Sequence, residues 1–147
     1  MEYLRNKKAT FDYHLQDTFE AGIELLGSEV KSLKNHQGSL NGAYVNLLGG
    51  ELYLLGAHVP PWQEKNAPAD FDSYRSRKLL LHKKELQEIA RAIQTKGLTV
   101  IPVSIYGKGR LIKTQIAIAK GKKNFDKRES LKKKAVKRDI DRELRRS

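Results

Sequence analysis

The stretch LTVIPVSIYGKGRLIKTQIAIAKG, residues 98–121, carries the most regular pattern of the sequence. Two β-branched runs flank the tetrapeptide GKGR at 107–110, and the second run alternates apolar with polar side chains over residues 112–118. A period of two is typical of a half-buried strand, and a glycine-containing turn joins antiparallel neighbours. The stretch predicts a β-hairpin. GKGR is its exposed basic turn and not a phosphate-binding loop, because no helix follows it.

Two further stretches predict strands. ATFDYHLQDTFEAGIELL, residues 9–26, alternates from Phe11 onward, which predicts a half-buried strand that bends at Ala21 and Gly22 into a second antiparallel segment. AYVNLLGGELYLLGAHV, residues 43–59, has two apolar runs around Gly49 and Gly50, the pattern of a tight hairpin. With residues 98–121, these stretches give about six strands.

Two helices complete the expected body. GSEVKSLKN, residues 27–35, predicts a short helix, with Ser28 as N-cap and Glu29 beside the positive N-terminus. LLLHKKELQEIARAIQTKG, residues 79–97, contains the longer one, because apolar residues recur at helical spacing from Leu86 to the stop at Gly97. Residues 62–77 have no period and predict a loop. We therefore expect a mainly β fold with helices over residues 1–120, an OB-like antiparallel barrel.

Charge separates a tail from this body. Residues 121–147 hold twelve basic and five acidic residues, a net charge of +7, whereas residues 1–120 hold 17 and 12, a net of +5. So polar a segment cannot bury a core, which predicts a tail that is disordered when free and helical on an acidic template. A total of +12 favours a polyanion as partner. The lack of cysteine and of any apolar run near 18 residues predicts a cytoplasmic protein with no membrane partner.

Nothing in the pattern favours an enzyme. The four histidines are more than 20 residues apart and form no metal-binding motif. Asp70 and Asp72 leave a metal-dependent nuclease as an alternative, although no third acid is placed to join them. A generic RNA- or single-stranded-DNA-binding OB module is a second alternative. We expect no catalytic residue, no metal, no cofactor and no small-molecule substrate.

Basic residues form three clusters near aromatic ones. The clusters are Arg5, Lys7 and Lys8; Arg75, Arg77 and Lys78; and Lys113, Lys120, Lys122 and Lys123. The aromatic side chains are Phe11, Tyr74, Tyr106 and Phe125. Cations for phosphates and flat groups for unstacked bases predict RNA binding.

Four ordered motifs then resemble a known family. NKKATFDYHL with TFEAGIELLGSEVKSLKN, RKLLLHKKEL, KGLTVIPVSIY and AKGKKNFDKRES are similar to the SmpB (small protein B) family, the bacterial partners of transfer-messenger RNA (tmRNA), over nearly the whole chain. The resemblance implies an OB-like barrel that binds the tRNA-like domain of tmRNA and escorts it to stalled ribosomes. There the body would stand in for the anticodon arm at the small-subunit decoding centre, and the tail would enter the empty mRNA channel.

The resemblance also implies site residues. Asn6, Phe11, Glu20, Leu80 and Lys113 match positions tied to tmRNA binding, and the basic clusters add Lys7, Lys8, Arg77, Lys78 and Lys120. The ribosome-engaging motif matches Gly121, Lys122, Lys123, Phe125, Asp126, Lys127 and Arg128. Phe125 stands where the family often has His or Tyr, which favours stacking on a base over acid–base work. Gly121 is expected to let the tail leave the barrel.

Overall fold

The computed structural model describes residues 1–63 and 71–122. Within them lie seven strands and three helices. In chain order these are β1 (Glu2–Arg5), α1 (Ala9–Asp12), β2 (Tyr13–Ile23), α2 (Gly27–Lys34), β3 (Tyr44–Leu48), β4 (Glu51–Leu55), β5 (Arg77–Leu80), α3 (Lys83–Ile93), β6 (Leu98–Lys108) and β7 (Leu111–Gly121).

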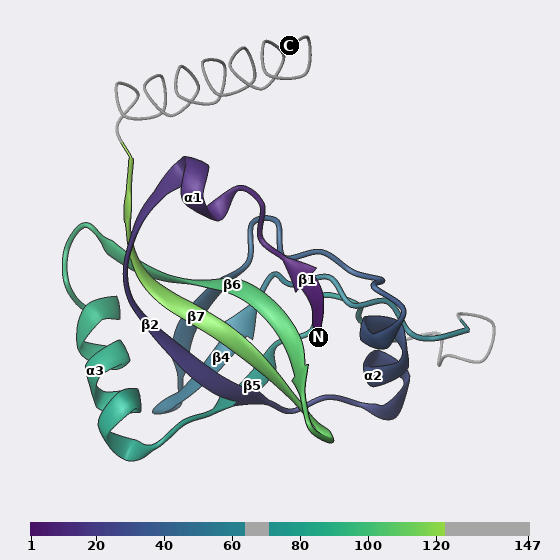
Figure 1. The fold of residues 1–147 in the computed structure, drawn as a ribbon. Coiled ribbons are helices and arrows are strands. Elements are labelled where there is room, and N and C mark those ends of the chain that lie inside the picture. Colours follow the sequence, from purple (N-terminus) through teal and green to yellow (C-terminus); the bar gives the residue numbers. More distant parts are fainter. Residues whose placement is uncertain (64–70, 123–147) are drawn as a thin grey trace, which may run out of the picture.

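All seven strands join one antiparallel sheet in the order β1-β6-β7-β2-β5-β4-β3. The sheet curls into a partly closed barrel, with β3 coming back toward β6 (Figure 1). Long β6, β7 and β2 form its front wall in that view, and α3 and α2 lie at opposite sides. The expectation of a mainly β antiparallel barrel with helices is confirmed.

Two tight hairpins were correctly placed by their glycines. In the β6–β7 hairpin Lys108 pairs with Leu111, and Gly109 has φ +61°. In the β3–β4 hairpin Leu48 pairs with Glu51, and both intervening glycines have positive φ. This left-handed backbone suits the right-handed twist of the flanking strands and favours glycine.

The core fills the inside of the barrel. Strand residues that alternate with the outward-facing ones, such as Ala21, Leu79, Ile105 and Ile116, are at most 1% exposed. The helix α3 covers one opening of the barrel with Ile89, which is fully buried, as its helical spacing predicted.

Three expectations about local structure were wrong. Phe11 lies in the helical turn α1 and not in a strand, because Asp12 N–H donates to Lys8 O and closes a turn there. β2 is one continuous strand through Gly22, since β7 pairs with it to that residue and β5 takes over from the other side. Arg77, expected at the end of a loop, instead begins the strand β5, because residues 77–80 pair with β2 on one side and β4 on the other.

The last strand of the barrel reaches Gly121, the residue at which the tail is expected to begin. Gly121 is the final residue of β7 and pairs with Tyr13. Beyond it, Lys122 N–H donates to Asp12 O at 2.9 Å and Lys122 Nζ donates to Thr10 O at 2.7 Å. The chain is therefore tied to α1 one residue past the sheet, and Gly121 takes part in the barrel wall.

Candidate nucleic-acid interface

Four outward-facing positions line up across neighbouring strands. Tyr106 of β6 pairs with Lys113 of β7, which pairs with Gly22 of β2, which pairs with Leu80 of β5. Directly opposed residues in a sheet point to the same face. The row therefore brings together residues that are far apart in sequence, such as Gly22 and Lys113, which are 91 positions apart. Glu20, two residues before Gly22 on β2, lies on the same face.

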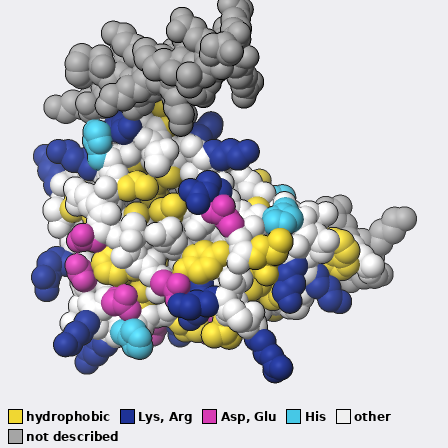
Figure 2. All heavy atoms as spheres, in the orientation of Figure 1, with side chains coloured by type: hydrophobic (Ala, Val, Ile, Leu, Met, Phe, Trp, Pro, Cys, Tyr) yellow, Lys and Arg dark blue, Asp and Glu magenta, His cyan; other side chains and the backbone are white. Residues whose placement is uncertain are grey.

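The face carries mixed chemistry. Figure 2 shows Lys and Arg side chains around its rim and also within it, where they lie beside acidic and apolar side chains. Leu80, the last residue of β5, is an apolar residue of this face and exposes 49% of its surface. An exposed apolar side chain with a lysine beside it fits a ligand that is both flat and anionic, as a nucleotide is.

Glu20 is held by two partners. Its Oε2 accepts a hydrogen bond from the Tyr106 hydroxyl at 2.5 Å, and its Oε1 accepts one from Lys108 Nζ at 2.9 Å. The hydrogen bonds from Tyr106 and from Lys108 lower the pKa of the Glu20 carboxyl below its usual range. Desolvation, and then the hydrogen bond to Glu20, raises the pKa of Tyr106 to about 12. Glu20 is thus ionised, and Tyr106 is a neutral donor, at physiological pH.

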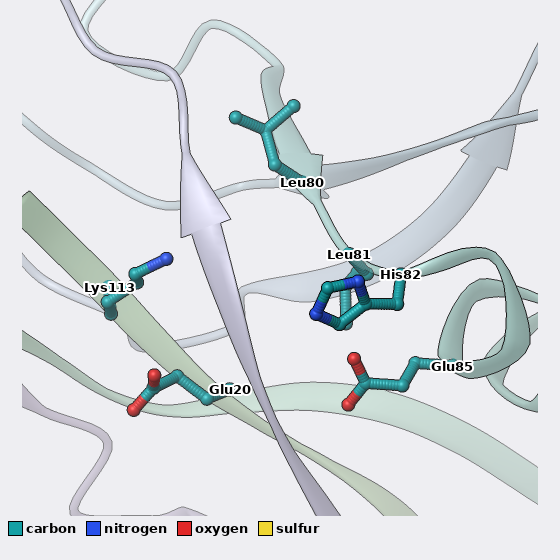
Figure 3. Close-up of a pocket in the computed structure, with 6 residues that line it drawn as sticks. All are labelled: Glu20, Leu80, Leu81, His82, Glu85 and Lys113. Atoms are coloured by element: carbon teal, nitrogen blue, oxygen red, sulfur yellow. The ribbon is translucent and has the colours of Figure 1, made fainter.

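A hollow of 470 Å³ opens beside Glu20. It is lined by Glu20, Leu80, Leu81, His82, Glu85 and Lys113. Figure 3 shows Glu20 and Lys113 on one side of β2, with Leu80, His82 and Glu85 on the other. The site combines an ammonium for a phosphate, carboxylates that accept from base amino groups or 2′-hydroxyls, and an apolar side chain for a sugar or base.

Arg77 does not belong to this surface, so the prediction that it contacts RNA is wrong. The residue is fully buried, and its Nε donates to Glu29 Oε2 at 2.9 Å. Its guanidinium also donates to Ala57 O at 3.0 Å and Ser73 O at 3.1 Å. Every side of the guanidinium is directed into the protein, so no phosphate can reach it. The next residue, Lys78, is half-buried, and its Nζ lies 3.7 Å from Glu51 Oε2.

Glu29 is the centre of this buried cluster. Arg75 Nε also donates to Glu29 Oε2, at 3.1 Å, and the Leu26 N–H donates to Oε1 at 2.8 Å. Burial alone would raise the pKa of Glu29, but the hydrogen bonds from Arg75, Leu26 and Arg77 outweigh it and lower the pKa. Desolvation lowers the pKa of Arg77, and the pair with Glu29 opposes that shift. The cluster joins α2 to the beginning of β5.

The N-terminal residues of the predicted site lie apart from the row. Asn6 is 9% exposed, and its Nδ2 donates to Pro102 O at 2.9 Å. Asn6 and Lys8 line a second hollow of 240 Å³ with Tyr13, Tyr44 and Thr99 among its other walls. Lys7 and Lys120 are exposed, and Phe11 is half-buried in α1. The structure thus divides the predicted residues into two groups.

The comparisons with known proteins decide the family. The model of the SmpB protein family matches residues 3–146. The chain belongs to the SmpB family. A protein of Clostridium acetobutylicum named SsrA-binding protein is 42% identical over 95% of this chain and 90% of its own length. A protein of the same name from Neorickettsia sennetsu is 53% identical over 86% of each chain.

A solved structure agrees with this membership. One of its chains superimposes with a TM-score of 0.71 at 38% identity, covering 89% of this chain and 95% of that chain. That structure is described as "tmRNA-SmpB: a journey to the center of the bacterial ribosome". The SmpB-family fold expected from the motifs is therefore confirmed.

The structure describes only two of the predicted ribosome-engaging residues of this SmpB-family chain. Gly121 and Lys122 lie at the end of β7, whereas Lys123, Phe125, Asp126, Lys127 and Arg128 lie outside the described residues. So does Asp70, one of the two acids of the nuclease alternative. Within residues 1–63 and 71–122 there is no group of three His, Asp or Glu side chains that could hold a metal ion, and no helix long and apolar enough to span a membrane.

Sequence reasoning missed two residues of the SmpB-family surface as parts of one site. The sequence marks Tyr106 only as an aromatic residue near basic ones, and Lys108 only as part of an exposed turn. Their contacts with Glu20 join residues 86 and 88 positions apart. The available signal was the alternation of the β6–β7 hairpin, which puts Tyr106 opposite Lys113, but the pairing of β7 with β2 was needed to add Glu20.

Proposed function

We propose that this chain binds the tRNA-like domain of tmRNA and delivers it to ribosomes stalled in translation, in the bacterial cytoplasm. The observation that carries the proposal is the match of this chain, over 95% of the length of the chain, to a protein named SsrA-binding protein. SsrA is another name for tmRNA. The structural likeness to a chain of the structure described as "tmRNA-SmpB: a journey to the center of the bacterial ribosome" supports the same partners.

The row on the barrel face is the proposed RNA-binding site. Lys113 neutralises a phosphate, and Leu80 packs against a sugar or base. Glu20 accepts from a base amino group or a 2′-hydroxyl, which gives specificity that a cation cannot give. The partial neutralisation of Glu20 by Lys108 keeps its charge from repelling the phosphates.

A second group of residues extends the surface along the barrel. Lys7, Lys8 and Lys120 add exposed cations, and Asn6 shapes the wall behind Lys8. We assign the ribosomal contacts to Gly121, Lys122 and the residues that follow. In this proposal the body takes the place of an anticodon arm, and the tail lies in the vacant mRNA channel, with Phe125 stacking on a decoding-centre base. The chain acts as a binding adaptor and performs no bond chemistry.

Affinity measurements test the RNA part of the proposal. The full chain is titrated with a transcript of the tRNA-like domain of tmRNA, with an elongator tRNA and with an unrelated hairpin, at several salt concentrations. We expect tight binding to the first only. Lys113→Ala is expected to lower that affinity about tenfold, a loss of about 1.4 kcal/mol, whereas Lys96→Ala, at an exposed turn after α3, is the matched control. Equal affinity for all three RNAs would leave a generic RNA-binding module.

A further inference from the structure

A groove adjoins the hollow beside Glu20 and shares Leu80 with it. Its volume is 280 Å³, and its walls include Gly22, Ile23, Leu25, Val30, Arg110 and Leu111. Leu80 and Lys113 line both hollows. Leu80 is therefore a ridge between two adjoining depressions of one surface, and any chain that crosses the first can continue into the second.

The groove is apolar and open to solvent. Leu111 exposes 61% of its surface and Leu80 exposes 49%, two of the larger exposures among the apolar side chains described. Ile23, Leu25 and Val30 are further apolar residues of its lining. Leaving such side chains in water forgoes the stabilisation that burial would give, so a ligand that covered Leu80 and Leu111 would gain that free energy.

Charge distinguishes the two depressions. The hollow beside Glu20 contains two carboxylates, Glu20 and Glu85, but the lining of this groove contains Arg110 and Lys113 and no acidic residue. An uncharged apolar peptide would have no use for these cations. A nucleotide has both features that the groove offers partners for, because its base has apolar faces and its phosphate is anionic.

Gly22 makes the geometry of the ridge possible. It lies between Lys113 and Leu80 in the register of three strands. A Cβ at this position would be 3.2 Å from the Cβ of Leu80, tighter than ordinary van der Waals contact. The missing side chain lets Leu80 stand close to β2 and keeps the floor between the two depressions low.

We propose that this groove binds one unstacked nucleobase of the tRNA-like RNA, packed between Leu80 and Leu111. Arg110 neutralises the phosphate of this nucleotide, and Lys113 binds the phosphate that links it to the nucleotide in the neighbouring hollow. The inference rests on the proposed function and adds a subsite to it: the RNA contacts both sides of Leu80, and the tip of the β6–β7 hairpin is part of the interface.

Two variants test the walls of the groove in the full-length chain. Leu111→Ala is expected to lower the affinity for the tRNA-like transcript by about fivefold or more, the lower end for loss of a base contact. Arg110→Gln is expected to reduce the slope of log affinity against log salt by about one. The matched controls are Leu48→Ala, a 45% exposed leucine at the other hairpin, and Arg91→Gln, an exposed arginine of α3.

An abasic scan identifies the base itself. Each unpaired nucleotide of the transcript is replaced in turn by an abasic one, and its affinity is measured with the wild-type chain and with Leu111→Ala. At one position the abasic replacement is expected to lower the affinity for the wild-type chain but to change the affinity for Leu111→Ala little, because the abasic replacement and the Leu111→Ala substitution remove the same contact. The absence of any coupled position would overturn the proposal, as would Leu111→Ala binding the RNA like Leu48→Ala.

The result for Lys113→Ala separates this inference from the function on which it rests. If Lys113→Ala weakens binding while Leu111→Ala and Arg110→Gln do not, the subsite is refuted and the proposed function stands. If the wild-type chain does not prefer the tRNA-like transcript, the proposed function fails. A Leu111→Ala variant that binds RNA normally but loses affinity for ribosomes would assign the groove to another occupant and overturn the proposal.

Discussion

The hydroxyl of Tyr106 donates a hydrogen bond to Glu20 at 2.5 Å, across the strand β7 that separates them in the sheet. Lys108 approaches the same carboxylate from the end of β6. Two residues of one hairpin thus fix the orientation of an acid carried by β2. An exposed glutamate otherwise samples many rotamers, so this pairing pre-organises its oxygens for the RNA donor that the proposed function assigns to Glu20.

Replacement of Tyr106 by phenylalanine tests whether this orientation matters. Tyr106→Phe is expected to weaken binding of the tRNA-like RNA by roughly three- to tenfold, the range for one ordinary hydrogen bond. Folding stability should change little, because the hydrogen bond between Tyr106 and Glu20 is exposed. The measurement is a double-mutant cycle with Glu20→Gln, with Tyr53→Phe on β4 as control. Additive losses would show that Tyr106 acts independently of Glu20.

The buried cluster of Glu29 with Arg75 and Arg77 predicts a large effect on stability. Glu29→Gln leaves a fully buried guanidinium without its counter-charge, which costs about 3–5 kcal/mol when a buried pair is broken. Urea unfolding measures this as a lower midpoint with an unchanged slope. Glu88→Gln, on the exposed side of α3, is the control. A loss below about 1 kcal/mol would mean that the cluster contributes no more than a surface pair.

The same cluster predicts a pH dependence. The pKa of Glu29 is lower in the folded chain than its usual value of 4.5, so the unfolded chain binds the proton more tightly. The stabilisation is therefore complete above pH 4.5 and is lost as pH falls through the lowered folded pKa. Unfolding midpoints measured between pH 7 and acid should fall more steeply for the wild type than for Glu29→Gln. Parallel curves would contradict this assignment.

Much of the fold followed from local patterns, and what did not depended on pairing. The hairpins around Gly49 and Gly109 and the helix α3 were predicted because alternation, turn glycines and helical spacing are written in neighbouring residues. The strand β5 was not. Its apolar run is consistent with either a helix or a buried strand, and only its neighbours β2 and β4 decide between them.

Arg77 shows the corresponding limit for the site. It stands in a basic cluster, and a basic cluster predicts an exposed cation. Its partner Glu29 is 48 residues away and had been interpreted as a helix-terminus residue. No local feature separates Arg77, which is buried, from Lys78, which is half-exposed. Glu20 and Leu80 are predicted site residues through family resemblance alone, Lys113 also through its basic cluster, and the structure explains the proximity of the three by strand register.

Removal of the residues after Lys122 separates the two proposed activities. The described barrel, including the bonds from Lys122 to α1, is complete at that point. Truncation there is expected to leave affinity for the tRNA-like RNA within about threefold at 0.15 M salt, where distant charges are screened, and to abolish tagging of stalled products in a reconstituted translation assay. Lys113→Ala is the reciprocal control, weak in RNA binding with its tail intact. A truncated chain that binds as poorly as Lys113→Ala would contradict this division.

A single methyl group at Gly22 tests the geometry of the ridge. In Gly22→Ala the new Cβ would lie 3.2 Å from the Cβ of Leu80, so Leu80 must move by a few tenths of an ångström. Leu80 is half-exposed and can shift outward, and alanine loses less backbone entropy on folding than glycine. The free energy of unfolding should therefore change by less than about 1 kcal/mol, at the lower edge of the usual cost of overpacking.

RNA binding should respond more than stability does. A displaced Leu80 fits neither depression well, and the added methyl group raises the floor between them, so the affinity of Gly22→Ala for the tRNA-like RNA is expected to fall about fivefold, or about 1 kcal/mol. Gly27→Ala, at the first residue of α2 with nothing within 4 Å of its Cβ position, is the matched control. Equal affinities for the two alanine variants would show that the RNA does not read the position of Leu80.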